Sequence, residues 1–470
     1  MKIRQIGLIS LLFISAQVGA QSFQQKISAA FNKLHADSQC RYASVALTVL
    51  DVKTGEQVFA ANPDMGLAPG STMKTITSIT AFNVLGKDFL YKTQVNYTGT
   101  ITNGTLNGDV VIKGDGDPML ASWRSKFTTE NNILFWFVKS LQELGVKKIN
   151  GSIIGDDGVY GSQAIPDGWI MQDLGTYYGA GTSGLCWREN KFDIKLNSST
   201  VGQPIAITHT VPAMPYLTIK SELITGAEGT GDQGYPYLPA FNSNVMYVRG
   251  TYAVDQTKKS IAAALPDPAY DAAYRLTDTL NRLGITVNNP PESTTTLIAK
   301  GRQVPQADKF VVSINSMSLS EIIYWQNHLS INLYAEQLLK TIALKTGKAV
   351  TTANGVKALQ DFWKAKGIDE NTLNIFDGSG LSPGDRVTTL TMARVLRSAK
   401  SESWFNDFYD SLPVYNDMHM KSGSINSCQA YAGYQTHNGR ELCFSIIVNN
   451  YNGSSRGIKD KLFKVLDVLK

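Results

Sequence analysis

The sequence predicts an α/β domain that is split by a large β-rich insertion. Three observations predict this fold class. A helix and two strands open the chain, over residues 22–37 and 42–64. Long helices, strands and a last helix close it, from about residue 318 to 470. A block of short strands lies between, from about residue 91 to 297. The simplest architecture is one α/β domain in which the two sequence halves meet, which makes the middle block an insertion.

The opening segment combines an amphipathic helix with a predicted hairpin. Residues 22–37 carry apolar side chains at helical spacing. Residues 42–64 contain two apolar strands joined by a tight turn at Lys53-Thr54-Gly55. Residues 69–86 then predict a mostly apolar helix that begins just after Gly70.

The middle block has a different pattern. Its short strands are separated by glycine and asparagine turns, and one helix is predicted over residues 271–284. Residues 287–296 are rich in proline, asparagine and threonine and are interpreted as a linker. We therefore expect the α/β domain to comprise residues 21–88 and 298–470, and the insertion, residues 89–297, to form two subdomains.

The closing segment begins with predicted helices and ends in a hairpin. The helices cover residues 318–347, 352–367 and 389–399. Residues 421–453 are interpreted as two strands that turn at Asn438-Gly439, and residues 457–470 as a last helix.

The first 20 residues have the pattern of a secretory signal peptide. Lys2 and Arg4 precede a short apolar core, and small residues precede a cleavage site after Ala20. No cysteine follows that site and no other segment is apolar for long enough to cross a membrane. We expect a periplasmic protein without a transmembrane segment in its mature chain. Its formal charge, +5, or +3 without the leader, excludes nucleic acid as an expected partner.

The cysteines and histidines do not suggest a metal site. Cys40, Cys186, Cys428 and Cys443 are scattered, and no cysteine, histidine or aspartate cluster has ligand spacing, so neither a metal nor a cofactor is expected. The predicted hairpin sets Cys443 opposite Tyr434, which argues against a bridge from Cys443 to Cys428. The sequence leaves other pairings open.

A possible nucleophile stands at the start of the 69–86 helix. Ser71 and Lys74 are three residues apart, so in a helix they share a face. The simplest interpretation is a helix-capping serine followed by a surface lysine. The alternative is a serine nucleophile with a lysine base, which requires burial to lower the pKa of the lysine and further polar groups around it.

Two more short motifs supply such groups, each with competing copies. Ser-Ile-Asn occurs at residues 313–315, 330–332 and 424–426. Only Ser330 and Asn332 lie at a break between two helical stretches, where both could point into a cleft. Lysine, threonine or serine, then glycine occurs at residues 53–55, 345–347 and 421–423. The first is a turn and the second ends a helix, whereas Lys421-Ser422-Gly423 begins a strand, where glycine would let a substrate approach the backbone.

With these three motifs in place, the sequence resembles the penicillin-recognising serine D,D-peptidases. Motif order, spacing and the insertion resemble the class C low-molecular-mass penicillin-binding proteins, the D-alanyl-D-alanine carboxypeptidase/endopeptidase group. So do residues 113–120, 177–185 and 377–383. The resemblance covers nearly the whole chain after residue 20 and implies a transpeptidase-like fold. One departure is Ile331, where many relatives have aspartate; since that position usually faces away from substrate, we expect activity to be retained.

The resemblance and the chemistry together imply a role for each residue. Ser71 attacks the carbonyl of the penultimate D-Ala, and Lys74 takes its proton. Ser330 passes a proton to the leaving D-Ala, and Asn332 orients the substrate amide. Lys421 and Ser422 hold the terminal carboxylate at Gly423, and the N–H groups of Ser71 and Ser424 form the oxyanion hole. Peptidoglycan stem peptides are the expected substrates and β-lactam antibiotics the expected inhibitors.

The insertion supplies a further candidate subsite. Asp173 and Tyr178 lie among aromatic residues, and they match in spacing an aspartate and a tyrosine that line a side-chain pocket in relatives. They are expected to bind the free ammonium on the third residue of a stem peptide, unless the segment is simply a loop buried by its aromatic residues.

Two other functions remain open from sequence alone. A β-lactamase of the same fold would need fast deacylation, for which the sequence shows no dedicated glutamate or tyrosine motif. A non-catalytic cell-wall-binding protein would not require the complete set of motif residues. The sequence does not separate carboxypeptidase from endopeptidase preference, and it does not give the oligomeric state.

Overall fold

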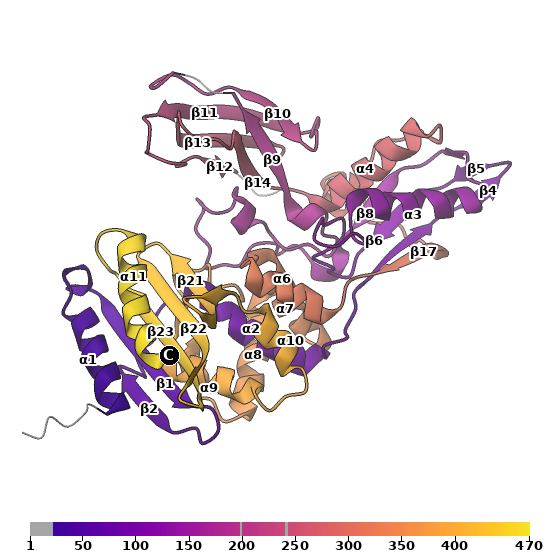
Figure 1. The fold of residues 1–470 in the computed structure, drawn as a ribbon. Coiled ribbons are helices and arrows are strands. Elements are labelled where there is room, and N and C mark those ends of the chain that lie inside the picture. Colours follow the sequence, from indigo (N-terminus) through magenta and orange to yellow (C-terminus); the bar gives the residue numbers. More distant parts are fainter. Residues whose placement is uncertain (1–21, 198–199, 240–242) are drawn as a thin grey trace, which may run out of the picture.

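The computed structural model describes residues 22–197, 200–239 and 243–470, so the expected signal peptide lies outside the described residues. Figure 1 shows two parts: a lobe that contains both ends of the described chain, and the inserted segment that extends from it. Within the described residues, the structure contains no helix with both the length and the apolar character needed to cross a membrane.

A six-stranded antiparallel sheet joins the two ends of the chain, which confirms the predicted fold class. β1 pairs with β2 on one side and with β23 on the other, so the first strands of the chain lie beside the last. In sheet order the strands are β2 (Gln57–Ala61), β1 (Ser44–Asp51), β23 (Arg440–Asn449), β22 (Cys428–His437), β21 (Met418–Ile425) and β20 (Val414–Tyr415).

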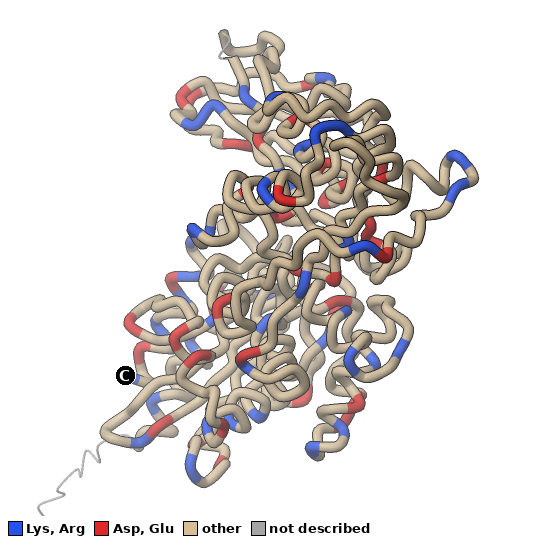
Figure 2. Tube along the Cα trace, turned by 90° about the vertical axis from the view of Figure 1, so that its right-hand side faces the viewer, with Lys and Arg blue, Asp and Glu red and all other residues tan. Residues whose placement is uncertain are grey.

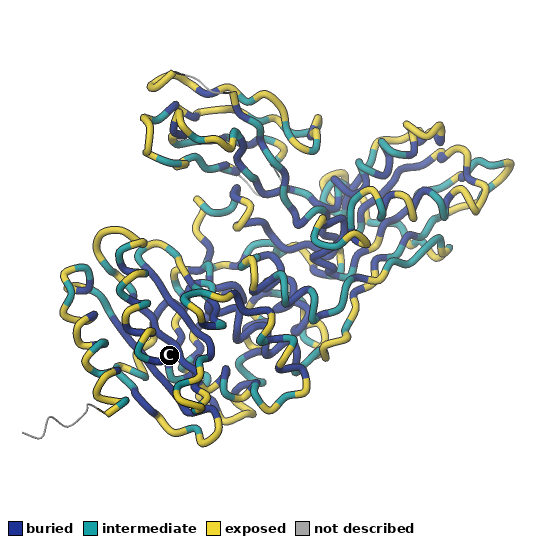
Figure 3. Tube along the Cα trace, viewed as in Figure 1, coloured by how far each residue is buried: buried dark blue, intermediate teal, exposed yellow. Residues whose placement is uncertain are grey.

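Alternate residues of β1 face opposite layers of helices. Val45, Leu47 and Val49 are buried against α1 (Phe23–His35) and α11 (Ser455–Leu466). On the other face, the Thr48 hydroxyl lies 2.9 Å from the Thr389 hydroxyl. Thr389 begins α9, one of the helices of that second layer: α2 (Met73–Leu85), α6 (Leu319–His328), α7 (Asn332–Lys345), α8 (Thr352–Ala365), α9 (Thr389–Ala399) and α10 (Phe405–Ser411). The sheet is therefore covered on both faces (Figure 3).

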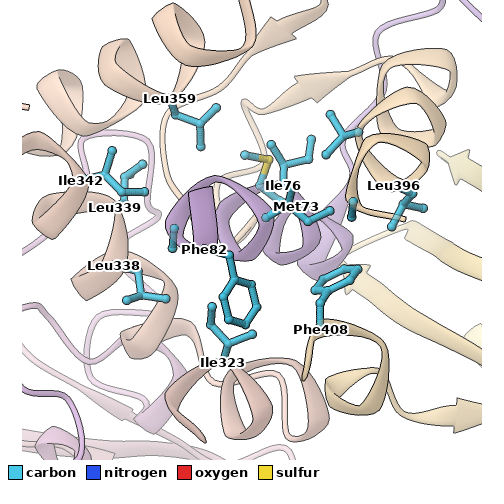
Figure 4. Close-up of a cluster of buried hydrophobic side chains, with 14 of the residues drawn as sticks. Met73, Ile76, Phe82, Ile323, Leu338, Leu339, Ile342, Leu359, Leu396 and Phe408 are labelled. Atoms are coloured by element: carbon cyan, nitrogen blue, oxygen red, sulfur yellow. The ribbon is translucent and has the colours of Figure 1, made fainter. Parts of the chain in front are cut away.

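Helix α2 is buried at the centre of the second layer. Met73, Ile76 and Phe82 contact apolar residues of the helices around it (Figure 4). The Phe82 ring stacks on Trp404 with centroids 4.8 Å apart. Because nearly every residue of α2 is enclosed, the start of this helix has a fixed position, which suits a residue that must be placed accurately.

The inserted segment contains two groups of sheets. The first group consists of a five-stranded and a four-stranded sheet. These two sheets share an apolar core with α3 (Glu130–Glu143) and α4 (Pro268–Arg282). Their strands are β3 (Lys92–Tyr97), β4 (Thr100–Thr102), β5 (Thr105–Asn107), β6 (Val110–Lys113), β7 (Lys148–Ile149), β8 (Ile153–Asp156), β15 (Thr286–Val287), β16 (Glu292–Ser293) and β17 (Lys309–Asn315).

The second group consists of two three-stranded sheets around a core of their own. Their strands are β9 (Lys191–Leu196), β10 (Ile207–Val211), β11 (Thr218–Gly226), β12 (Tyr235–Tyr237), β13 (Val245–Ala253) and β14 (Ser260–Ala264). Acidic and basic residues alternate along both lobes in Figure 2, without one sign dominating the side shown.

Four details differ from the sequence predictions. Helix α3 was not predicted, and the expected linker contains β16 and the start of α5 (Thr294–Ala299). β17 pairs with β3 of the insertion, so the boundary proposed at residue 298 precedes a strand that belongs to an insertion sheet. The closing hairpin has a further turn, at which Ser427 adopts a φ of 53°, and this turn separates β21 from β22.

The cysteine prediction is confirmed. Cys443 pairs with Tyr434 across β22 and β23, while Cys428 pairs with Asn449. All four cysteines are buried free thiols.

Candidate active site

Ser71 and Lys74 meet at the entrance to α2. Ser71 lies in a short 3-10 turn, Gly70–Thr72, that leads directly into the helix. The Lys74 ammonium donates a hydrogen bond to the Ser71 hydroxyl at 2.9 Å. Ser71 makes no side-chain cap hydrogen bond at the start of this turn or of α2, so the capping interpretation is wrong.

Lys74 is enclosed by acceptors and has no access to solvent. Besides Ser71 it donates to Asn332 Oδ1 at 2.6 Å and to the Ser379 carbonyl at 2.8 Å. Burial lowers the pKa of Lys74 to about 7, although Asp377 and Glu336 act in the opposite direction. A lysine with this pKa is able to accept a proton near neutral pH.

Ser330 and Asn332 occupy the break between α6 and α7. Ser330 has a φ of 58°, in the left-handed region that serine rarely adopts. Asn332 begins α7, and its Nδ2 donates to the Tyr178 carbonyl at 2.8 Å while its Oδ1 accepts from Lys74. Ile331 packs against the core around α2 and also lines the cavity described below.

Lys421 joins the third motif to the second. Its ammonium donates to the Ser330 hydroxyl and to the Ser422 carbonyl, both at 2.9 Å. Burial, and then the charge of Lys74, hold the pKa of Lys421 well below its ordinary value. Lys421 is thus hydrogen-bonded directly to Ser330, and a second group of hydrogen bonds links Lys74 to Ser71 and to Asn332.

The two glycines beside the nucleophile allow a close backbone approach. A Cβ added to Gly423 would lie 2.8 Å from the Thr72 nitrogen and 3.0 Å from the Ser71 nitrogen. One added to Gly70, whose φ is 51°, would lie 2.7 Å from the Ser424 nitrogen. Gly423 therefore accommodates the chain's own Ser71 turn, whereas the sequence suggested room for substrate. The contact brings the backbones at Ser71 and Ser424 together, as an oxyanion hole requires.

A cavity of about 620 Å³ opens at this point. Six of the predicted site residues line it: Ser71, Ser330, Asn332, Ser424, Asp173 and Tyr178. Lys74 and Lys421 lie behind its wall, bonded to Ser71 and Ser330. Ser422 and Gly423 are on the same strand but are not part of the lining.

The insertion supplies one wall of the cavity. The Tyr178 hydroxyl donates to Asp173 Oδ1 at 3.3 Å. Burial raises the pKa of Asp173, and the hydrogen bond from Tyr178 opposes this. The two residues predicted to act as a pair are therefore in contact and exposed to the same cavity.

Buried carboxyl groups behind Lys74 were missed by the sequence analysis. Glu336 accepts from the Ser379 N–H at 2.8 Å and so fixes the loop whose carbonyl binds Lys74. Asp377 accepts from the Gly380 N–H at 2.7 Å and from Trp169 Nε1 at 2.8 Å. The available signal was the position of Glu336, four residues after Asn332 and hence on the same face of α7.

A second missed cluster lies in the cavity wall near Asp173. Glu189, which is 2% exposed, accepts from Arg124 Nε at 2.8 Å and pairs with Lys191 at 2.9 Å. Ser122 and Tyr334 also donate hydrogen bonds to this carboxylate. The buried carboxylate of Glu189 thus forms ion pairs with both Arg124 and Lys191, and these two cations line the cavity.

Comparison with known proteins identifies the family of this chain. The model of the D-Ala-D-Ala carboxypeptidase 3 (S13) family matches residues 27–468. A D-alanyl-D-alanine carboxypeptidase of Actinomadura sp. (strain R39) is 26% identical over 437 residues, which are 87% of this chain and 78% of that protein. The D-alanyl-D-alanine carboxypeptidase DacB of Haemophilus influenzae is 23% identical over 440 residues, 89% and 88% of the two chains.

Solved structures show the same fold. The crystal structure of penicillin binding protein 4 (dacB) from Haemophilus influenzae superposes with a TM-score of 0.78 at 21% identity, over 94% of this chain and 98% of that one. The same protein in complex with a β-lactam gives 0.73 at 19% identity, over 95% and 99%. The chain belongs to the S13 family of D-Ala-D-Ala carboxypeptidases and is a serine peptidase of that class.

Proposed function

We propose that the chain removes the terminal D-Ala of peptidoglycan stem peptides through an acyl-enzyme on Ser71, and that penicillins acylate the same hydroxyl. The observation that carries this proposal is the 2.9 Å hydrogen bond between Ser71 and a buried Lys74 whose pKa is about 7. The leader-like pattern of residues 1–20 supports a periplasmic location for this activity.

In the proposed acylation step, Ser71 Oγ attacks the carbonyl carbon of the penultimate D-Ala. Lys74 takes the serine proton, and the oxygen that becomes negative is met by the N–H groups of Ser71 and Ser424. When the C–N bond breaks, Ser330 gives its proton to the departing amine and regains one from Lys421, to which it is bonded. Water then attacks the ester carbonyl and gives a proton through Ser330 back to Lys421, while Lys74 returns its proton to Ser71 Oγ as the ester C–O bond breaks.

The test is labelled penicillin followed by peptide mapping. We expect a single adduct on Ser71, no adduct in Ser71→Ala, and the same unfolding temperature for both proteins. An adduct on another residue would overturn the mechanism. Mass spectrometry of cross-linked and uncross-linked muropeptides after digestion would then separate endopeptidase from carboxypeptidase activity.

A second experiment tests the Asp173 subsite. Asp173→Asn should lower kcat/KM on a stem-peptide mimic that carries a free side-chain amine, because the ammonium would lose its anionic partner. It should leave penicillin acylation unchanged, since penicillin has no such amine. Equal losses in both assays would make Asp173 a structural residue, and no loss in either would place the ammonium elsewhere.

A further inference from the structure

A second hollow lies beside the active-site cavity. This hollow has a volume of about 400 Å³ and shares Tyr177 and Lys191 with the first. Arg188 and Lys258 add two more cations to its lining, and Asp193 is the one acidic residue there. The rest of the lining is apolar or aromatic: Trp123, Phe192, Val211 and Ala262. The Asp193 carboxylate is already paired with Lys195 at 2.9 Å. A substrate that extends from the active-site cavity past Tyr177 and Lys191 would therefore reach a space with more cations than anions.

The positive charge of this space is held in place by an unusual turn. Arg188, Glu189 and Asn190 are three consecutive non-glycine residues with φ of 54°, 54° and 49°. The turn directs Glu189 inward, where it carries both Arg124 and Lys191. Left-handed residues in succession persist only where surrounding contacts enforce them, and they gather at binding and catalytic sites. Here the contact is Asn190, which is buried and bonded to Gly181 and Trp187.

The cations outnumber their anionic partners. Arg124 and Lys191 share the single carboxylate of Glu189, and Arg188 pairs with Glu130 at 3.1 Å. Lys258 is exposed and has no ion pair among the described residues. The Lys191 ammonium lies 4.9 Å from the centre of the Trp123 ring and 5.7 Å from that of Tyr177, so aromatic faces flank the charge.

We propose that this hollow, named here the Lys191–Lys258 hollow, binds a free carboxylate of the peptide that lies upstream of the third stem residue. This inference rests on the proposed function. The positive charge of the hollow fits the second residue of a stem peptide. This is a glutamyl residue that is joined through its side chain, so its α-carboxylate remains free. The ammonium of Lys258 takes that carboxylate, and the exposed faces of Trp123 and Tyr177 cover the adjoining apolar part of the peptide.

The experiment compares two stem peptides that differ only at the second residue, one with the free α-carboxylate and the other with its amide. We expect the wild-type protein to release D-Ala from the carboxylate form with a kcat/KM about threefold to fivefold higher, as suits a partly exposed ion pair. Lys258→Glu should reverse the preference. Lys220→Glu, an equal charge change at an exposed position of β11 outside this hollow, should keep it.

The outcomes separate this inference from the proposed function. Equal efficiency on both peptides, with normal penicillin acylation of Ser71, would refute the carboxylate site and leave the proposed function intact. No acylation of the wild-type protein would refute the proposed function itself. An equal loss of preference in Lys258→Glu and Lys220→Glu would mean that overall charge, and not the hollow, selects the peptide.

Discussion

Ser330 has two features that substitution can separate, its hydroxyl and its left-handed backbone. Ser330→Ala removes the hydroxyl and keeps a Cβ at a φ of 58°, whereas Ser330→Gly removes both. A Cβ in this region costs about 1–2 kcal/mol. Glycine in turn lowers the free energy of unfolding by about 0.5–1 kcal/mol, because it gives the unfolded chain more conformational freedom. The glycine variant should therefore have a free energy of unfolding about 0.5–1 kcal/mol larger than that of the alanine variant.

Both variants should lose turnover alike, because both lose the hydroxyl that Lys421 contacts at 2.9 Å. Removal of a proton-transfer group typically lowers the rate by about 10²–10⁴-fold. Urea unfolding and D-Ala release measure the two effects. As a control, Ser427, with a φ of 53° in the turn after β21, should show the same glycine–alanine difference in stability without the loss of turnover. An alanine variant of Ser330 that is as stable as the glycine variant, or fully active, would refute the reasoning.

Three further outcomes are expected. Because Lys74 must be neutral to act as a base and its pKa is about 7, the rate of penicillin acylation should fall about tenfold per pH unit below pH 7; a flat profile between pH 5 and 8 would exclude Lys74 as the base. Trp169→Phe removes a donor from the buried Asp377 and should lower the free energy of unfolding by about 1–3 kcal/mol, whereas Trp136→Phe, exposed on α3, should not; equal urea midpoints would contradict this. Lys421→Ala should reduce kcat/KM for peptides with a free terminal carboxylate by about 10²-fold or more, with a much smaller change in thermal stability; an unchanged kcat/KM would remove Lys421 from substrate binding.

The parts of the site that were predictable are those that short sequence patterns encode. Ser71 and Lys74 are neighbours on one helix turn, so their spacing alone places them together. Ser330 could be selected from three copies of its motif because two helical patterns break there. The meeting of the two chain ends in one α/β domain followed from the helices and strands at both ends, and the structure adds that β1 pairs with β23.

The parts that were missed depend on contacts between distant segments. Glu336 and Asp377 carry no local signal for meeting behind Lys74, since tertiary packing alone brings α7 and the 377–380 loop together. Arg124 and Glu189 meet through three left-handed residues without a glycine, which no turn rule predicts. Helix α3 begins with Glu130 and two asparagines, and asparagine has a low helix propensity, for which packing against the core of the insertion compensates.

The pairing of strands from both chain ends in one sheet has a consequence for the synthesis of the protein. β1 can form its pairs with β23 only after the ribosome has added the 389 residues that separate Asp51 from Arg440. At about 5–20 residues per second, this delay lasts on the order of 20–80 s. For most of that time the nucleophile helix, Met73–Leu85, has already been synthesised, but the strand with Lys421 and Gly423 that completes its surroundings has not. The peptidase is therefore inactive during synthesis by topology alone, and a nascent chain that stalls before its last strands should leave the β23-facing edge of β1 unpaired and available to chaperones.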